Sequence, residues 1–165
     1  MNRPTFYTSS NKPIRAGGVI FYYQDPLTNN IKMLLQYTEK IKDNIKRYLY
    51  EDIGGKTDEN DKSINDTIIR ETLEETNNII SKELITDYLN RENKILYLEK
   101  SKYHLVLIKV DDDIKCLDRR LFGKEDNSSG KKRLFYWVDS NRLRFGGLPF
   151  SERIWFLRKQ ILSLL

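Results

Sequence analysis

Three glutamates, Glu71, Glu74 and Glu75, are the residues of this chain whose type and spacing most directly suggest chemistry. The segment from about Ser63 to Asn78 predicts a helix, and a step of roughly 100° per residue places the three carboxylates on one exposed face. The opposite face carries Ile69, Leu73, Thr76 and Ile80. Because like charges at this spacing destabilise an isolated helix, the pattern indicates either a solvated acidic face or a bound cation that removes the repulsion.

The three acids belong to a longer motif that begins at a glycine pair, Gly54-Gly55. This stretch resembles the Nudix box, G-x5-E-x7-R-E-U-x-E-E-x-G-U, in which U is an aliphatic residue. Gly55 matches the first glycine of the pattern, and Arg70 with the three glutamates matches its R-E-x-x-E-E order. The resemblance implies a loop, a helix and a second loop that together hold divalent cations against a pyrophosphate.

The motif departs from the pattern at three places. One additional residue lies between Gly55 and Arg70, so the early glutamate position falls on Asp61 in one register and on Lys62 in the other. Thr72 stands where the pattern has an aliphatic residue, and the angle count places it on the flank of the helix. Asn77 replaces the glycine after the helix, and asparagine is the residue that best tolerates a left-handed conformation after glycine.

The resemblance implies a MutT-like pyrophosphohydrolase, in which water attacks a phosphorus of a nucleoside diphosphate linked to another group. Carboxylate ligands favour a hard cation, so the expected cofactor is Mg²⁺, with Mn²⁺ as a substitute. Arg70 is expected to orient a glutamate of the box through its planar fork. The expected metal ligands are Glu71, Glu74, Glu75 and the backbone at Gly55, and the expected substrate-binding residues are Lys56, Lys132 and Arg133.

Two residues compete for the role of general base. In the MutT branch of the family the proton-accepting glutamate lies in a loop before the last strand, within a Gly-Lys-Glu sequence. Here Gly123-Lys124-Glu125 stands in the corresponding loop, which makes Glu125 one candidate. Other branches take the base from the box helix, which makes Glu71 the other.

Composition places the chain among single-domain intracellular proteins. Its 165 residues, 39% of them hydrophobic, are sufficient for one core, and a single cysteine, Cys116, allows no disulfide within the chain. No segment predicts a membrane span or a signal peptide, so the expected location is the cytoplasm. The 29 basic residues exceed the 24 acidic ones, giving a net charge of +5, and this excess favours polyanionic partners such as nucleotides or RNA.

The order of predicted elements indicates an α+β domain. Residues 1–13 are expected to form an irregular arm, and residues 14–165 a single domain. Strands are expected at 14–23, 31–37, 47–53 and 134–140. Two more strands are expected within 94–110, about a turn near residues 100–102. Loops are expected at 38–46 and 118–133. A C-terminal amphipathic helix starts after Ser151. The resemblance implies the same architecture, an α/β/α sandwich around a mixed β-sheet.

Three functions remain open at this point. The chain is an active pyrophosphohydrolase, a Nudix-fold binding module without catalysis, or a basic nucleic-acid-binding module whose acidic helix is incidental. The family's substrates include nucleoside triphosphates, dinucleoside polyphosphates, diphosphoinositol polyphosphates and the mRNA cap. Basic clusters at Arg119-Arg120 and Lys131-Lys132-Arg133 give the RNA alternative some support, although such clusters are equally typical of solvated loops.

Overall fold

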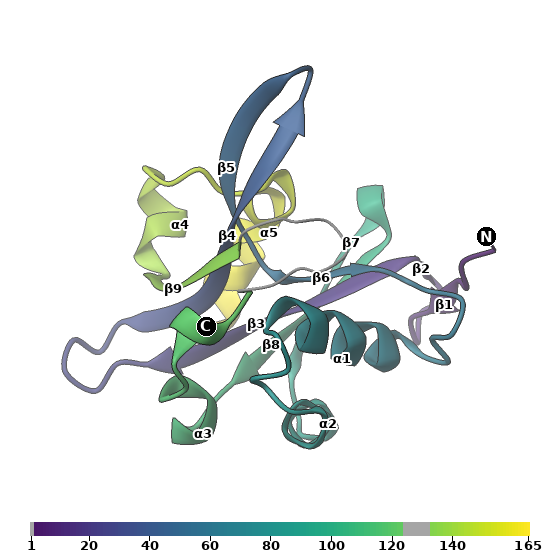
Figure 1. The fold of residues 1–165 in the computed structure, drawn as a ribbon, viewed down its shortest axis with the longest axis horizontal. Helices are drawn as coiled ribbons and strands as arrows, with labels where there is room; N and C mark the ends of the chain where they lie inside the picture. Colours follow the sequence, from purple (N-terminus) through teal and green to yellow (C-terminus); the bar gives the residue numbers. More distant parts are fainter. Residues whose placement is uncertain (1, 124–132) are drawn as a thin grey trace.

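A mixed β-sheet forms the middle layer of the molecule (Figure 1). The computed structural model describes residues 2–123 and 133–165. Within these residues the strands β5, β4, β3, β8 and β7 follow one another across the sheet, while β6 also pairs with β3 and β9 with β4. Strands β3 and β8 are parallel and the other pairs are antiparallel. The bounds are β3 Ala16–Gln24, β4 Ile31–Lys42, β5 Ile45–Glu51, β6 Ile53–Lys56, β7 Lys94–Leu98, β8 Tyr103–Lys109 and β9 Arg133–Asp139.

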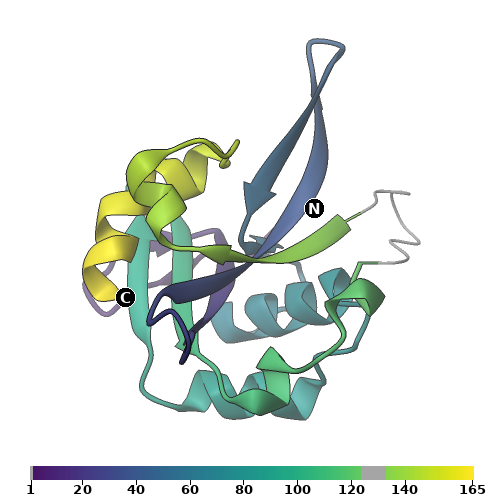
Figure 2. The ribbon, with the colours of Figure 1, turned by 90° about the vertical axis from the view of Figure 1, so that its left-hand side faces the viewer.

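Helices cover both faces of this sheet (Figure 2). Since successive residues of a strand point to opposite faces, β3 contributes Val19 and Phe21 to one core and Ile20 and Tyr22 to the other. The first core is closed by α1 (Ile64–Glu75), α2 (Lys82–Asn90) and α3 (Asp112–Lys115), and the second by α4 (Asn141–Phe145) and α5 (Glu152–Leu164). The predicted α/β/α sandwich is therefore confirmed. None of the described helices is both long and apolar enough to cross a bilayer.

Two stretches predicted to be irregular contain strands. In the N-terminal arm, β1 (Phe6–Tyr7) pairs with β2 (Pro13–Ile14) in a small hairpin. The expected loop at 38–46 was also wrong, because β4 continues to Lys42 and β5 already begins at Ile45. Asp43 and Asn44 both have positive φ, 52° and 61°, as a tight hairpin turn of two residues requires. The many charged side chains of this stretch are typical of a loop, but its backbone is paired between β4 and β5.

The remaining elements follow the predicted order. Two strands about a turn are confirmed by β7 and β8, with a 3₁₀ turn η1 (Glu99–Ser101) and a left-handed Lys102 between them. Ser151 caps α5 by accepting a hydrogen bond from the Ile154 amide. The stretch before β7 that showed no clear pattern forms α2, and another 3₁₀ turn, η2 (Arg119–Leu121), lies in the predicted loop.

The end of α1 shows how two departures from the box are accommodated. Asn77 has a φ of 53°, so it takes the left-handed conformation for which the pattern uses glycine. Thr72 is fully buried, and its side-chain hydroxyl has no hydrogen-bond partner among the described residues. The Thr76 hydroxyl, by contrast, donates to the Thr72 carbonyl over 2.6 Å.

We expect Thr72→Val to raise the free energy of unfolding by about 1 kcal/mol, because it removes a buried hydroxyl that lacks a partner. Thr76→Val is the matched control, and it should lower that free energy by about 1 kcal/mol because it removes a hydrogen bond that is made. Urea denaturation of both variants checks the pair. A loss of stability in Thr72→Val equal to that in Thr76→Val would show that the Thr72 hydroxyl is paired in solution.

Candidate functional site

Helix α1 lies directly against the glycine pair at β6. A Cβ added to Gly55 would be 2.3 Å from Oε1 of Glu71, so a side chain here would displace the carboxylate from its present position. At its start the helix is capped by Ser63, whose hydroxyl accepts a hydrogen bond from the Asp66 amide. The glycine pair and the helix therefore form one unit that places the Glu71 carboxylate over the β6 backbone.

Arg70 is the centre of an ion-pair network. Its Nε and Nη2 donate to the two carboxylate oxygens of Asp61 over 3.2 and 3.1 Å, while Nη1 donates to Glu71 over 2.7 Å. Nη2 also donates to the Lys56 carbonyl over 2.9 Å, and Glu74 lies 3.6 Å from Nη1. The predicted association of Arg70 with a box glutamate is thus present in the structure, and the partner is Glu71.

The same network includes Asp61, one of the two residues that compete for the early box position. Asp61 is buried, and the exposed Lys62 has no part in the network. Burial alone would raise the pKa of Asp61, but hydrogen bonds from Arg70, the Asp58 amide and the Thr67 hydroxyl lower it below the usual value. Asp61 thus acts as the counter-ion of Arg70. If Asp61 takes the early glutamate position, the one residue that this chain has in excess of the Nudix pattern lies between Asp61 and Arg70.

The expectation that the three glutamates share an exposed face was wrong. Only Glu74 is open to solvent, with 60% of its side chain exposed, whereas Glu71 keeps 14% and Glu75 only 8%. The angle count gives the relative directions of side chains but not which direction is inward. Here the buried residues of the helix are Thr67, Ile68, Thr72 and Glu75, so the inward face includes Glu75 and the neighbouring direction of Glu71.

Glu75 is held by polar groups of the sheet. Its Oε2 accepts hydrogen bonds from the Gly54 amide over 3.0 Å and from Gln36 Nε2 over 2.9 Å, and Oε1 lies 3.5 Å from Arg133. Burial raises the pKa of Glu75 to about 8; Arg133 opposes this rise, and the neighbouring Glu71 adds to it. Burial also raises the pKa of Glu71, against the influence of Arg70.

Gln36 is a site residue that sequence reasoning missed. It is the one polar side chain within an apolar run of β4, and this is the only signal that could have indicated it. Besides Glu75, its amide nitrogen donates to the Asp52 carbonyl over 2.8 Å. Its Oε1 is buried and has no hydrogen-bond partner among the described residues.

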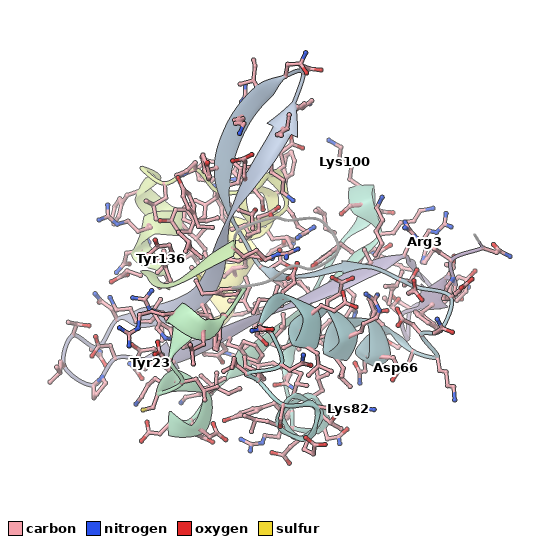
Figure 3. The ribbon with its side chains drawn as sticks, in the orientation of Figure 1. Arg3, Tyr23, Asp66, Lys82, Lys100 and Tyr136 are labelled. Atoms are coloured by element: carbon pink, nitrogen blue, oxygen red, sulfur yellow. The ribbon has the colours of Figure 1, made fainter. Side chains whose placement is uncertain are left out.

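A cavity of about 560 Å³, the central cavity, opens beside these groups. Gln36, Gly54, Gly55 and Glu75 form part of its wall, and Glu51 adds a second carboxylate. The described residues around it also include six cationic side chains, those of Arg3, Arg15, Lys40, Lys56, Arg133 and Arg153. Of these, Arg3 comes from the N-terminal arm (Figure 3). The predicted residues Lys56 and Arg133 line this cavity, while Lys132 and Glu125 lie outside the described residues.

The donor atoms at this place suit a hard cation. Among the described residues, no three acidic, histidine or cysteine side chains converge as a metal centre, since Glu71 is turned to Arg70 and Glu74 to solvent. However, two carboxyl groups with raised pKa and the unpaired amide oxygen of Gln36 form a set made only of oxygen. Such a set fits Mg²⁺ or Mn²⁺ better than Zn²⁺.

A buried ion pair connects α5 to the same region. Asp52 is fully buried, and its Oδ1 accepts a hydrogen bond from Nε of Arg153 over 2.8 Å and forms an ion pair with Nη2 over 2.7 Å. The Tyr103 hydroxyl donates to the other carboxylate oxygen, and the Arg153 guanidinium lies 4.0 Å from the centre of the Tyr103 ring. Because the Asp52 carbonyl also holds Gln36, this pair supports the position of a residue that contacts Glu75.

Arg153→Leu should lower the free energy of unfolding by about 3–5 kcal/mol, since it leaves the Asp52 carboxylate buried without its cation. Arg158→Leu makes the same change in the same helix at a guanidinium that stacks on the partly exposed Trp155, and a change of about 0.5 kcal/mol or less is expected there. Adding Asp52→Asn to Arg153→Leu should recover part of the loss. Equal unfolding midpoints for the two single variants in urea would contradict this account.

Comparison with known proteins supports the architecture. Neither a protein-family model nor a curated protein sequence matches the chain. Among solved structures, a MutT from work on the Aliivibrio salmonicida and Vibrio cholerae proteins is similar with a TM-score of 0.50 and 14% identity, over 92% of this chain and 98% of the other. The Nudix domain of Shewanella oneidensis NrtR is similar with a TM-score of 0.50 and 13% identity, over 96% and 92% of the two chains. The chain therefore has the Nudix fold.

Proposed function

We propose that the chain is a divalent-cation-dependent hydrolase that cleaves the pyrophosphate bond of a nucleoside diphosphate linked to another group. One observation carries the proposal: Glu75 is buried at a cavity surrounded by cationic side chains, and Glu71 lies against Gly55, which belongs to the wall of the same cavity. Burying two like charges side by side is unfavourable unless a cation offsets them. The Nudix fold of two solved relatives supports the same conclusion.

In this proposal Glu71, Glu74, Glu75 and the Gly55 carbonyl hold Mg²⁺, or Mn²⁺ as a substitute. When bound, the cation neutralises pyrophosphate charge and acts as a Lewis acid at phosphorus. Arg70 is a positioning residue, because its hydrogen bonds to Asp61 and to the Lys56 carbonyl fix the guanidinium that orients Glu71.

The phosphates of the substrate are bound by cations of the central cavity. Lys56 and Arg133 line it at the edge nearest the glycine pair, and Lys132 is proposed as a further contact. The Shewanella domain was solved in complex with ADP-ribose, a nucleoside diphosphate linked to a second group, which supports a nucleotide-like substrate for this chain. One water loses a proton to a glutamate and attacks phosphorus, the bridging P–O bond of the pyrophosphate breaks, and the other phosphate departs with the group attached to it.

The test of the function is a panel of nucleoside triphosphates, dinucleoside polyphosphates, diphosphoinositol polyphosphates and capped RNA, assayed with Mg²⁺ and with Mn²⁺. Mass spectrometry of the products identifies the bond that is broken. Hydrolysis that disappears in EDTA supports the proposal. Ligand binding without turnover under all of these conditions would instead establish the non-catalytic alternative.

Glu74→Gln should reduce turnover by at least about 10²-fold, the scale of losing a key electrostatic group, and weaken Mn²⁺ binding. Because Glu74 is exposed, the fold and the unfolding midpoint should be retained. Glu83→Gln, the same change at an exposed position of α2, is the control and should leave turnover and Mn²⁺ binding as in the parent. Calorimetric Mn²⁺ titration and steady-state kinetics check the prediction. Parental turnover in Glu74→Gln would place the cation elsewhere.

We propose Glu125 as the general base, with Glu71 as the alternative. Glu125→Gln should lower kcat by roughly 10² to 10⁴, the usual contribution of general base catalysis, while Mn²⁺ affinity stays near that of the parent. Glu71→Gln, by contrast, should change both quantities, because Glu71 is also a proposed cation ligand. If Glu125→Gln turns over at the parental rate, the role passes to Glu71.

A further inference from the structure

The hairpin of β4 and β5 extends beyond the rest of the sheet. Described pairing of β4 with β9 ends at Thr38, opposite Arg133, whereas pairing with β5 continues to Lys42. From Glu39 to Tyr48 the two strands thus pair with each other, and Figures 1 and 2 show the hairpin standing clear of the body. Two-stranded ribbons are marginally stable alone, and here Tyr37 stacks between Tyr48 and Tyr50 at the base.

One face of this hairpin continues the face that carries Gln36. Residues paired across the two strands share a face, and the face alternates along each strand. The pairs on the Gln36 face are Gln36 with Glu51, Thr38 with Leu49, Lys40 with Arg47 and Lys42 with Ile45. The opposite face carries Glu39 with Tyr48 and Ile41 with Lys46. A row of cations therefore leads outward from the candidate site on one side of the hairpin only.

A second cavity, the hairpin groove, lies between this hairpin, η1 and the start of α5, and has a volume of about 760 Å³. Its cations are Lys40, Lys42, Arg47, Lys100 and Arg153, its acids are Glu51 and Glu152, and its apolar residues are Ile41, Leu49, Leu98, Phe150 and Phe156. Lys100 extends from η1 on the side of the molecule from which the hairpin projects (Figure 3). Lys40, Glu51, Ser101 and Arg153 also line the central cavity, so the two cavities adjoin.

The charges of the hairpin groove are only partly compensated. Lys40 is paired with Glu51 over 3.1 Å, and Arg153 is paired with Asp52. Within the described parts of the chain, Lys42 and Arg47 form no ion pair. Lys100 Nζ lies 5.3 Å from the centre of the Phe156 ring, and this ring is 53% exposed. The outer groove thus combines free positive charge with an accessible aromatic surface.

The central cavity has the reverse character. Among its described lining residues Tyr103 is the single aromatic one, and its side chain is buried. Cations without an aromatic surface suit phosphates, whereas cations beside aromatic rings suit the backbone and stacked bases of single-stranded nucleic acid. A ligand that satisfies both cavities carries a run of phosphates at one end, followed by nucleotides.

We propose that the hairpin groove binds single-stranded RNA whose 5′ polyphosphate occupies the central cavity. This inference rests on the proposed function, since it names the substrate class of the same site. Transcripts begin with a 5′ triphosphate, so RNA has the required order of groups. The hairpin face with Lys42 and Arg47 then follows the backbone, and Phe156 stacks a base.

The test compares a 5′-triphosphorylated RNA of ten nucleotides with ATP as substrates. The Lys42→Gln/Arg47→Gln double variant should lower the ratio of kcat/KM for RNA to kcat/KM for ATP by at least about tenfold at low salt. The salt dependence of RNA binding should also become shallower, by about 0.7 in the logarithmic slope for each cation removed. The control is Lys46→Gln on the opposite face of the same hairpin, which should change neither quantity.

Binding of fluorescent RNA, measured by anisotropy, provides a readout that does not need turnover. Phe156→Ala should weaken it by at least about fivefold, the lower end of what one stacked base contributes. Equal binding by the parent and the double variant overturns the proposal, as does tighter competition by inorganic tripolyphosphate than by the RNA. If no substrate is hydrolysed but the double variant loses RNA affinity, the groove is supported and the proposed hydrolase function fails.

Discussion

The contact of α1 with the glycine pair is the constraint on which the rest of the site depends. At Gly55 a methyl group would meet the Glu71 carboxylate in its present position. Loss of solvent around the Glu71 and Glu75 carboxyl groups raises the pKa of both. Arg70 and the backbone amide of Gly54 donate hydrogen bonds to these two carboxylates, and these bonds offset part of the cost of burial. The packing of α1 therefore also determines how Glu71 and Glu75 are oriented.

Features that depend on neighbours in the sequence could be predicted from the sequence. The glycine pair, the contact of Arg70 with a box glutamate and the left-handed residue after the helix are local, and the structure contains all three. The apolar spacing of the last helix is local as well, and Ile154, Leu157 and Ile161 are buried as the pattern indicates. The layered architecture follows from the order of these elements.

Features that depend on distant contacts could not be predicted. Gln36 reaches Glu75 across 39 residues of chain, and Arg153 reaches Asp52 across 101, so no spacing rule connects them. The exposure of the three glutamates was misjudged for the same reason, since it is set by what packs on α1. The hairpin was missed because its many charged residues resemble a loop, whereas alternation and a partner strand decide its structure.

Strand β5 also forms an edge of the sheet, and this position exposes the protein to a different hazard. An edge strand offers unpaired backbone groups to any other extended chain, and Ile41 and Ile45 near the tip are exposed by 64% and 54%. Lysines and arginine are interleaved with these apolar residues, and charge at an edge discourages strand addition by a second molecule. The basic residues of the hairpin therefore also oppose aggregation through this edge. Replacing them with apolar residues would remove that protection.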